Sequence, residues 1–239
     1  MRANRDGIPL GGLHWDRLFS DIDTLQIALP GSVNAGELDR QVQRTLARNG
    51  IAGDARVRLA VFRGEGGLYE TGGAGGYVIE ASPIDPRPAL NGNGLVLGVY
   101  EAARKSCDLL ANIKSNNFLV YVMAALHATK QGWNDSLVLN SNGRVADSTI
   151  ANVFWVQGNV ICTTPLSEGG VAGVMRKHLL QQASGKGFAV EERSVSVAGL
   201  ESADEVFLTN AISGLRWVKQ LNGRVFANAV AASLYPLTL

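Results

Sequence analysis

Several features that mark other protein classes are missing from this 239-residue chain. No apolar run approaches the roughly 20 residues that cross a bilayer, and the N-terminus lacks the apolar core of a signal peptide. Cys107 and Cys162 are too few for a disulfide framework and lack the CxxC spacing of a zinc or redox site. The 22 lysines and arginines nearly balance the 21 aspartates and glutamates, which argues against a general electrostatic grip on nucleic acid or anionic membrane. We therefore expect a cytoplasmic protein with no nucleic-acid or membrane partner.

The signatures of metal and nucleophile enzymes are missing as well. The sequence has no HExxH motif, no GxSxG elbow and no Walker loop, and its three histidines are scattered along the chain. The glycines from Gly72 to Gly76 lack the GxGxxG spacing and are typical of a hairpin connection. We therefore expect neither a metal site nor a Ser/His/Asp triad.

The composition that remains is that of a globular protein, with 46% hydrophobic and 18% charged residues. Its length predicts one or two domains. The prolines and turn residues of PIDPRPALNGNG predict a linker at 85–92, between a small N-terminal α+β domain (1–84) and a larger mixed domain (93–239).

Hydrophobic periodicity predicts the elements of each domain. In the first domain we expect helices at 13–27 and 35–48, the second capped by Asn34, and strands at 56–63 and 77–82. In the second domain we expect helices at 117–130 and 174–183 and a hairpin turn at Asn222-Gly223. Its expected strands, mostly antiparallel, are 95–100, 136–140, 145–147, 151–156, 160–163, 190–193 and 205–209.

One lysine has surroundings suited to covalent chemistry. Lys114, in ANIKSNNFL, precedes a predicted helix and is flanked by small and amide residues rather than by charges. A lysine that attacks a carbonyl near neutral pH must be partly desolvated. On these residues alone, a solvated lysine is the commoner alternative.

Several segments occur in an order that is typical of one family. They are HWDRLFSDIDTLQIALP, KSNNFL, LVLNSNGRVADSTIANVFW, VICTTPLSEGGVAGVMR and ADEVFLTNA. Together they resemble the fold-type IV pyridoxal-phosphate enzymes, the class IV aminotransferase and aminodeoxychorismate lyase family. The resemblance implies a two-domain α+β fold like that of D-amino-acid aminotransferase, with pyridoxal 5'-phosphate in the cleft between the domains. It also implies a small amino substrate and a homodimer.

The resemblance assigns the two central roles. Lys114 falls at the lysine that attaches the cofactor and then carries a proton during turnover. Asp147 falls where the family has a glutamate that keeps the pyridine nitrogen protonated, so that the ring can accept electrons. Aspartate has the right charge but is one methylene shorter. The alternative for Asp147 is an ordinary residue at a strand end.

The remaining site residues follow by position. Arg17 matches the helix arginine that clamps the cofactor phosphate, and its alternative is a surface arginine. Three further places are assigned from the family motifs: Val171 against the pyridine ring or simply in the core, the backbone amides of Val174 and Met175 at the phosphate, and Asn210 with Ala211 in a second phosphate-side loop. Arg58 is the candidate for a substrate carboxylate, with Arg63 as its competitor.

The motifs ANVFW, VAGVMR and TNA are most similar to the lyase branch. The expected reaction therefore converts 4-amino-4-deoxychorismate to 4-aminobenzoate and pyruvate, for folate biosynthesis. Met175 and Phe118 replace a threonine and a tyrosine that branched-chain aminotransferases usually carry. An aminotransferase acting on branched-chain or D-amino acids with 2-oxoglutarate is the first alternative. A degenerate paralogue without turnover is the second.

The start of the chain departs from the family pattern. Relatives begin about 30 residues earlier with two further strands, without which the first-domain sheet would expose unpaired backbone. We therefore expect Met1 to be an internal methionine of a longer protein.

Covalent attachment of the cofactor at Lys114 can be tested directly. Borohydride reduction of the protein incubated with pyridoxal phosphate should fix the cofactor on the peptide that contains Lys114, because only an imine to that amine is reduced in place. Peptide mass spectrometry locates the label. A label on Lys105 or Lys130, or a yellow Lys114→Ala protein, would contradict the assignment.

Overall fold

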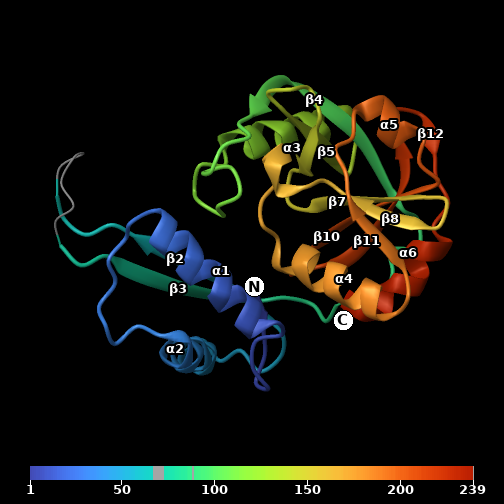
Figure 1. Cartoon of the computed structure of the whole chain (residues 1–239). Helices are drawn as coiled ribbons and strands as arrows, with labels where there is room; N and C mark the ends of the chain where they lie inside the picture. The colour runs from blue at the N-terminus through green and yellow to red at the C-terminus, as the bar shows by residue number, and fades with distance from the viewer. Residues whose placement is uncertain (67–72, 88, 239) are drawn as a thin grey trace. The chain divides into compact units, whose positions relative to one another are not determined.

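The computed structural model describes residues 1–66, 73–87 and 89–238, which form two compact units, Met1–Pro86 and Arg87–Leu239 (Figure 1). Gly72, in the expected glycine-rich connection, and Pro88, in the expected linker, lie outside the described residues. Both units combine helices with strands, which confirms the α+β class.

The first unit packs two helices against a three-stranded antiparallel sheet of order β1-β2-β3. Its elements are β1 (Arg2–Ala3), α1 (Gly11–Thr24), α2 (Ala35–Arg48), β2 (Ala55–Phe62) and β3 (Gly76–Pro83). The helix expected at 35–48 is confirmed, and Oδ1 of Asn34 caps it by accepting a hydrogen bond from the backbone N–H of Glu37 at 3.0 Å. α1 ends before the expected Ile27, because Gln26 has a φ of 53° that no helix allows.

The second unit is built on a nine-stranded mixed sheet. Its strands are β4 (Leu95–Lys105), β5 (Asp135–Asn140), β6 (Val145–Ser148), β7 (Asn152–Gln157), β8 (Val160–Thr163), β9 (Ala189–Glu192), β10 (Glu205–Asn210), β11 (Gly214–Leu221) and β12 (Arg224–Val225). They follow the order β6-β5-β4-β11-β10-β7-β8-β9, with β12 beside β11. The backbone N–H of Val145 on β6 donates to the carbonyl of Val195, which follows β9, at 2.9 Å. The two ends of the sheet therefore meet, and the sheet curls back on itself.

Among the described residues, four α-helices accompany this sheet: α3 (Leu119–Gln131), α4 (Val174–Gly185), α5 (Val197–Glu201) and α6 (Ala229–Leu234). α4 and α6 share an apolar core with β7 and β10, where the rings of Phe154 and Phe207 stack with centroids 5.2 Å apart. No helix in the described part of the chain has the length and apolar character needed to span a membrane.

The sequence predicted the six strands from β5 to β10 to within one residue at either end, and both long helices of this unit. The expected hairpin turn at Asn222-Gly223 is confirmed between β11 and β12, but the bounds of β11 and the helices α5 and α6 were not predicted. The strand expected at 95–100 runs on to Lys105, because β4 continues beside β5 after a break in register between Tyr100 and Lys105. This extension changes which lysine reaches the centre of the unit.

Parallel pairing of β4 with β5 requires a crossover connection. Residues 106–118 and α3 provide it, and Lys114 lies in that connection. β6 pairs with the other edge of β5 through the turn at Asn142-Gly143, and it carries Asp147. The fold thus places β4, which ends at Lys105, and β6, which carries Asp147, on the two sides of β5.

α3 exposes an apolar stripe. Leu119, Val122, Met123 and Leu126 are all exposed and follow the i, i+3, i+4, i+7 spacing of one helical face. Its other face buries small residues, including Ala124, against β4 and β5. An exposed apolar stripe of this kind usually marks a contact surface.

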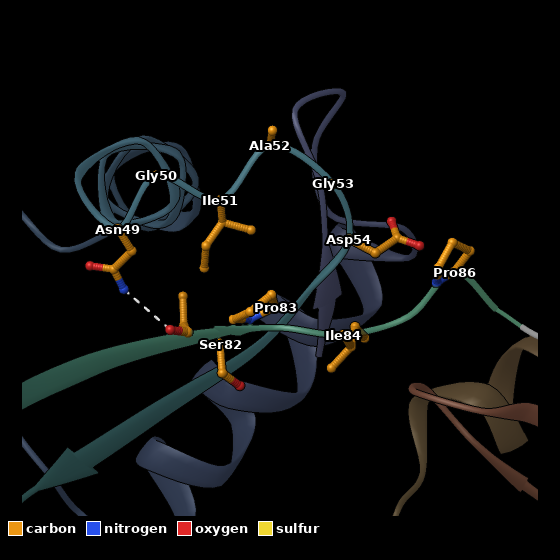
Figure 2. A pocket seen from close by; sticks show the side chains of 11 residues that line it. Asn49, Gly50, Ile51, Ala52, Gly53, Asp54, Ser82, Pro83, Ile84 and Pro86 are labelled. Atoms are coloured by element: carbon orange, nitrogen blue, oxygen red, sulfur yellow. Dashed lines mark hydrogen bonds between the residues drawn. The ribbon is translucent and has the colours of Figure 1, made fainter.

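A shallow pocket of about 500 Å³ lies in the first unit, between the turn after α2 and the end of β3 (Figure 2). Ile51 and Pro83 line it together with backbone, and its one carboxylate, Asp54, is paired with Arg2. The described lining residues therefore provide no unpaired charged side chain that could bind or react with a ligand.

Candidate functional site

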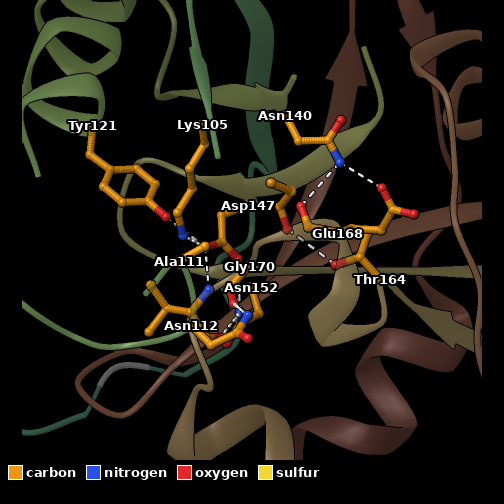
Figure 3. A network of polar contacts seen from close by, with 12 residues as sticks. Lys105, Ala111, Asn112, Tyr121, Asn140, Asp147, Asn152, Thr164, Glu168 and Gly170 are labelled. Atoms are coloured by element: carbon orange, nitrogen blue, oxygen red, sulfur yellow. Dashed lines mark hydrogen bonds and ion pairs between the residues drawn. The ribbon is translucent and has the colours of Figure 1, made fainter. Parts of the chain in front are cut away.

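Asp147 is the centre of the polar cluster in the second unit. Its side chain is buried on β6. Oδ2 accepts hydrogen bonds from the Tyr121 hydroxyl at 2.9 Å and from the backbone N–H of Val171 at 2.8 Å, and Oδ1 accepts one from the Asn152 amide at 2.8 Å (Figure 3). Burial raises the pKa of Asp147 above its ordinary value, and the opposing effects of Lys105 and these three donors do not offset it fully.

Lys105 supplies the positive charge beside this carboxylate. As the last residue of β4 it reaches inward, with Nζ 3.7 Å from Oδ2 of Asp147 and 5.1 Å from the centre of the Tyr121 ring (Figure 3). Burial lowers the pKa of Lys105, against the attraction of Asp147. Burial, followed by the nearby Asp147 charge, raises the pKa of the Tyr121 phenol, which therefore stays a donor.

Lys114 is exposed on the connection between β4 and α3. It is close enough to Lys105 for its charge to contribute to the lowered pKa of that lysine. In this structure, the desolvation expected of a nucleophilic lysine is found at Lys105 and not at Lys114.

The connection that carries Lys114 is tied to the segment that precedes α4. The Asn112 side-chain amide donates to the carbonyls of Leu166 at 2.8 Å and Gly170 at 2.6 Å (Figure 3), and the backbone N–H of Ala172 donates to the carbonyl of Asn112 at 2.9 Å. Val171, between these contacts, donates to Asp147. Residues 112, 147 and 170–172 therefore form one hydrogen-bonded framework.

Two glycines of this segment have no room for a side chain. A Cβ on Gly173 would lie 1.8 Å from Oδ1 of Asn152, and one on Gly170 would lie 3.0 Å from both the Ala146 carbonyl and Oδ1 of Asp147. The close packing of backbone around Asp147 therefore depends on glycine at these positions.

α4 begins at Val174, directly after this segment, with Gly173 as its N-cap. The first amides of a helix have no acceptor within the helix, and the helix dipole makes this end attractive to anions. The side chains of Val174 and Met175 are buried, so their backbone amides are the groups that can serve an anion. The start of α4 can therefore hold a phosphate.

The loop between β10 and β11 contains Asn210 and Ala211. Oδ1 of Asn210 accepts hydrogen bonds from the backbone N–H groups of Ile212 at 2.9 Å and Ser213 at 2.8 Å. The Asn210 side chain therefore stabilises the turn.

Glu168 fixes the segment before α4 from its other side. Its buried carboxylate accepts hydrogen bonds from Asn140, Arg144 and Ser194, with Nε of Arg144 at 2.7 Å (Figure 3 shows Asn140 and Glu168). Burial raises the pKa of Glu168, but these hydrogen bonds outweigh it, so the pKa lies below its ordinary value. Glu168 thus joins the β5–β6 hairpin to the segment that contacts Asp147.

Arg17 and Arg58 belong to the first unit. Arg17 is half-buried on α1, where burial lowers its pKa against the attraction of Asp21. Arg58 forms an exposed cross-strand ion pair with Glu80 at 3.1 Å, a contact of small energetic value. Arg63, its competitor, donates to the backbone carbonyls of Leu25 and Gln26.

Sequence reasoning missed most of the residues that contact Asp147 or hold the segment beside it. Lys105 lay beyond the expected end of its strand, and Tyr121 was read only as a helix residue. Asn112, Asn152 and Glu168 lie in connections or strands where periodicity says nothing about polar contacts. The only available signal was that Asn152 and Glu168 stand inside the family-like segments.

The comparisons with known proteins agree on one family. The family model described as Amino-transferase class IV matches residues 1–221. The chain is 32% identical to an aminodeoxychorismate lyase from Vibrio harveyi, over 84% of the chain and 74% of that protein. It is 30% identical to a Methanocaldococcus jannaschii protein provisionally named a branched-chain-amino-acid aminotransferase, over 90% of the chain and 74% of that protein.

A solved structure with the same fold is the branched-chain aminotransferase from the thermophilic archaeon Thermoproteus uzoniensis with norvaline. It superposes with a TM-score of 0.87 at 24% identity, over 98% of this chain and 81% of that one. At this identity the likeness establishes the fold.

The Glu168 network predicts a pH-dependent stability. Because the folded-state pKa is depressed, the network stabilises the protein above the unfolded-state pKa of about 4.3, and the contribution is lost as pH falls through the folded-state pKa. Glu168→Gln should cost roughly 1–3 kcal/mol at pH 7, and the difference from the parent should shrink below about pH 4.3.

Urea unfolding between pH 3 and pH 7 measures this difference. Glu80→Gln, which removes the exposed partner of Arg58, is the matched control and should stay close to the parent throughout. A Glu168→Gln deficit that does not change with pH would show that the charge is not what the network uses.

Proposed function

The chain belongs to the class IV aminotransferase family, and from this we propose that it is an aminodeoxychorismate lyase that uses pyridoxal 5'-phosphate. The observation that carries the proposal is the buried Asp147 carboxylate, which lies in one hydrogen-bonded framework with the start of α4 and the Lys114 connection. The substrate is 4-amino-4-deoxychorismate, and the products are 4-aminobenzoate and pyruvate.

The residues present suit the cofactor. Asp147 is a buried carboxylate that can accept the N–H of a protonated pyridine, and the glycines at 170 and 173 let the segment before α4 pack closely beside it. We assign the amides of Val174 and Met175 and the loop of Asn210 and Ala211 to the phosphate, and Val171 to one face of the ring. When bound, pyridoxal phosphate acts as an electron sink for the carbon that loses its proton.

Two further assignments depend on the family resemblance alone. Arg17 binds the cofactor phosphate, for which a guanidinium fork is well suited. Arg58 meets a substrate carboxylate and must leave its exposed pair with Glu80 to do so, at little cost.

Lys114, rather than Lys105, is the lysine that we assign to attachment and proton transfer. The carbonyl carbon and the ring nitrogen of the cofactor lie at opposite ends of a pyridine ring. If Asp147 binds the ring nitrogen, an amine bound to that carbon is separated from Asp147 by the width of the ring. Nζ of Lys105, at 3.7 Å from Asp147, is too close for this position. Lys114, exposed on its connection, is not subject to that constraint.

The lyase is favoured over an aminotransferase by the identity to the Vibrio harveyi enzyme and by the apolar Met175 and Phe118, which offer no hydroxyl. The aminotransferase is the second candidate, acting on branched-chain or D-amino acids with 2-oxoglutarate. The similarity to the Methanocaldococcus jannaschii protein supports it. Both cysteines are free thiols, as in a reducing compartment, and we propose a cytoplasmic location.

The reaction is tested by assaying both chemistries side by side. With 4-amino-4-deoxychorismate, the protein loaded with pyridoxal phosphate should release equal amounts of 4-aminobenzoate and pyruvate. Lys114→Ala should lose at least a hundredfold in rate, because it removes a positioned proton carrier. Lys130→Ala, at an exposed lysine in the last turn of α3, is the control and should keep full rate. Glutamate formed from 2-oxoglutarate and an amino-acid panel, with no 4-aminobenzoate, would instead identify an aminotransferase.

We also propose a homodimer, in which the apolar stripe of α3 meets a second copy. One patch that covers its own equivalent across a two-fold axis buries both exposed stripes at once. Leu126→Glu places a charge on this surface and should shift the protein from dimer to monomer in sedimentation equilibrium. Val225→Glu, at an exposed apolar residue of β12, is the control and should stay dimeric. A parent protein that sediments at 25.4 kDa would refute the dimer.

A further inference from the structure

Lys105 and Asp147 form a buried pair of charges in which the lysine has an unusual position. Nζ of Lys105 is 3.7 Å from Oδ2 of Asp147, beyond hydrogen-bond length, and it has no hydrogen-bond partner within the described residues. Both side chains are almost fully shielded from solvent, with 11% of Lys105 and 3% of Asp147 exposed. Burying an ammonium without a hydrogen bond is costly, so its presence calls for an explanation.

The carboxylate needs a counter-charge that its other partners do not provide. Tyr121, Asn152 and the Val171 backbone all donate to Asp147, but all three are neutral. Their hydrogen bonds favour the charged carboxylate, but burial opposes it, and the pKa of Asp147 stays above its ordinary value. Three ionisable groups among the described residues influence the pKa of Lys105. Asp147 is the buried anion among them, and Lys114 and Cys107 lie on the connection that follows β4.

We propose that Lys105 is a positioning residue, whose ammonium supplies the counter-charge that keeps Asp147 ionised and fixed in place before any ligand enters the site. The Tyr121 ring supports this arrangement, because it lies against Nζ and offers a cation–π contact. Because Nζ of Lys105 does not hydrogen-bond to Asp147, the oxygens of Asp147 accept hydrogen bonds only from the three neutral donors among the described residues. These hydrogen bonds set the orientation of the carboxylate. Lys105 therefore acts through charge, while the neutral donors act through geometry.

This inference rests on the proposed function in one respect: the proposed function explains why Asp147 should be ionised, namely to bind a protonated pyridine nitrogen. The pairing itself belongs to the cofactor-free protein. It can therefore be tested without pyridoxal phosphate, and a protein that fails to bind the cofactor would overturn the proposed function without deciding the role of Lys105.

The direct experiment is carbon-13 NMR of the cofactor-free protein, labelled at aspartate side-chain carboxyl carbons. The Asp147 signal is identified by its loss in Asp147→Asn. In the parent it should report an ionised carboxyl group at pH 7. In Lys105→Met the proton affinity of Asp147 should rise at least tenfold, and the signal should move toward the protonated position. Lys105→Arg should restore the parent signal, because it keeps the positive charge.

Lys130→Met, which removes an exposed lysine of α3, is the matched control and should leave the Asp147 signal unchanged. An unchanged signal in Lys105→Met would overturn the proposal. A merely structural lysine would alter stability without changing the proton affinity of Asp147.

A second measurement covers the case in which Lys105→Met folds poorly. The double variant Lys105→Met/Asp147→Asn has no buried charge left unpaired and should be more resistant to urea than Lys105→Met alone. If the two substitutions instead destabilise additively, the residues are not coupled and the proposal is wrong.

Discussion

The second unit is organised around one constraint, the burial of the Asp147 carboxylate. A carboxylate removed from water must be given hydrogen bonds and a positive charge, or it becomes neutral. β4 contributes Lys105, α3 contributes Tyr121, β7 contributes Asn152, and the segment before α4 contributes the Val171 amide. Elements that are far apart in the sequence are thus joined at a single side chain.

The surroundings of this carboxylate are fixed largely by backbone. Gly170 and Gly173 allow the segment before α4 to pass close to Asp147 and Asn152. Asn112 holds the same segment from the Lys114 connection, and Glu168 holds it from the β5–β6 hairpin. This rigidity delivers the start of α4 and the carboxylate to one place, as a ligand with an anionic group and a basic ring nitrogen requires.

Two kinds of sequence signal predicted part of this arrangement: the local pattern of apolar and capping residues, and the order of the family-like segments. Periodicity predicted α2 and its Asn34 cap, because an apolar stripe and a capping side chain are both encoded within a few residues. Asp147 was singled out because it falls where the family-like hairpin carries a glutamate. The role of Lys105 could not be predicted, since the charged run EAARK hides a strand that is stabilised by its neighbour β5 and not by its own alternation. The exposure of Lys114 also ran against expectation, because desolvation depends on tertiary contacts that a sequence does not display.

We therefore propose different roles for the two lysines: Lys105 balances a buried charge, and Lys114 attaches the cofactor. A crystal structure of the protein grown with pyridoxal phosphate tests this most directly. We predict electron density continuous with Lys114, the ring nitrogen beside Asp147, the phosphate at the start of α4, and Lys105 unmodified. Density joined to Lys105, or a cofactor bound away from Asp147, would contradict the account.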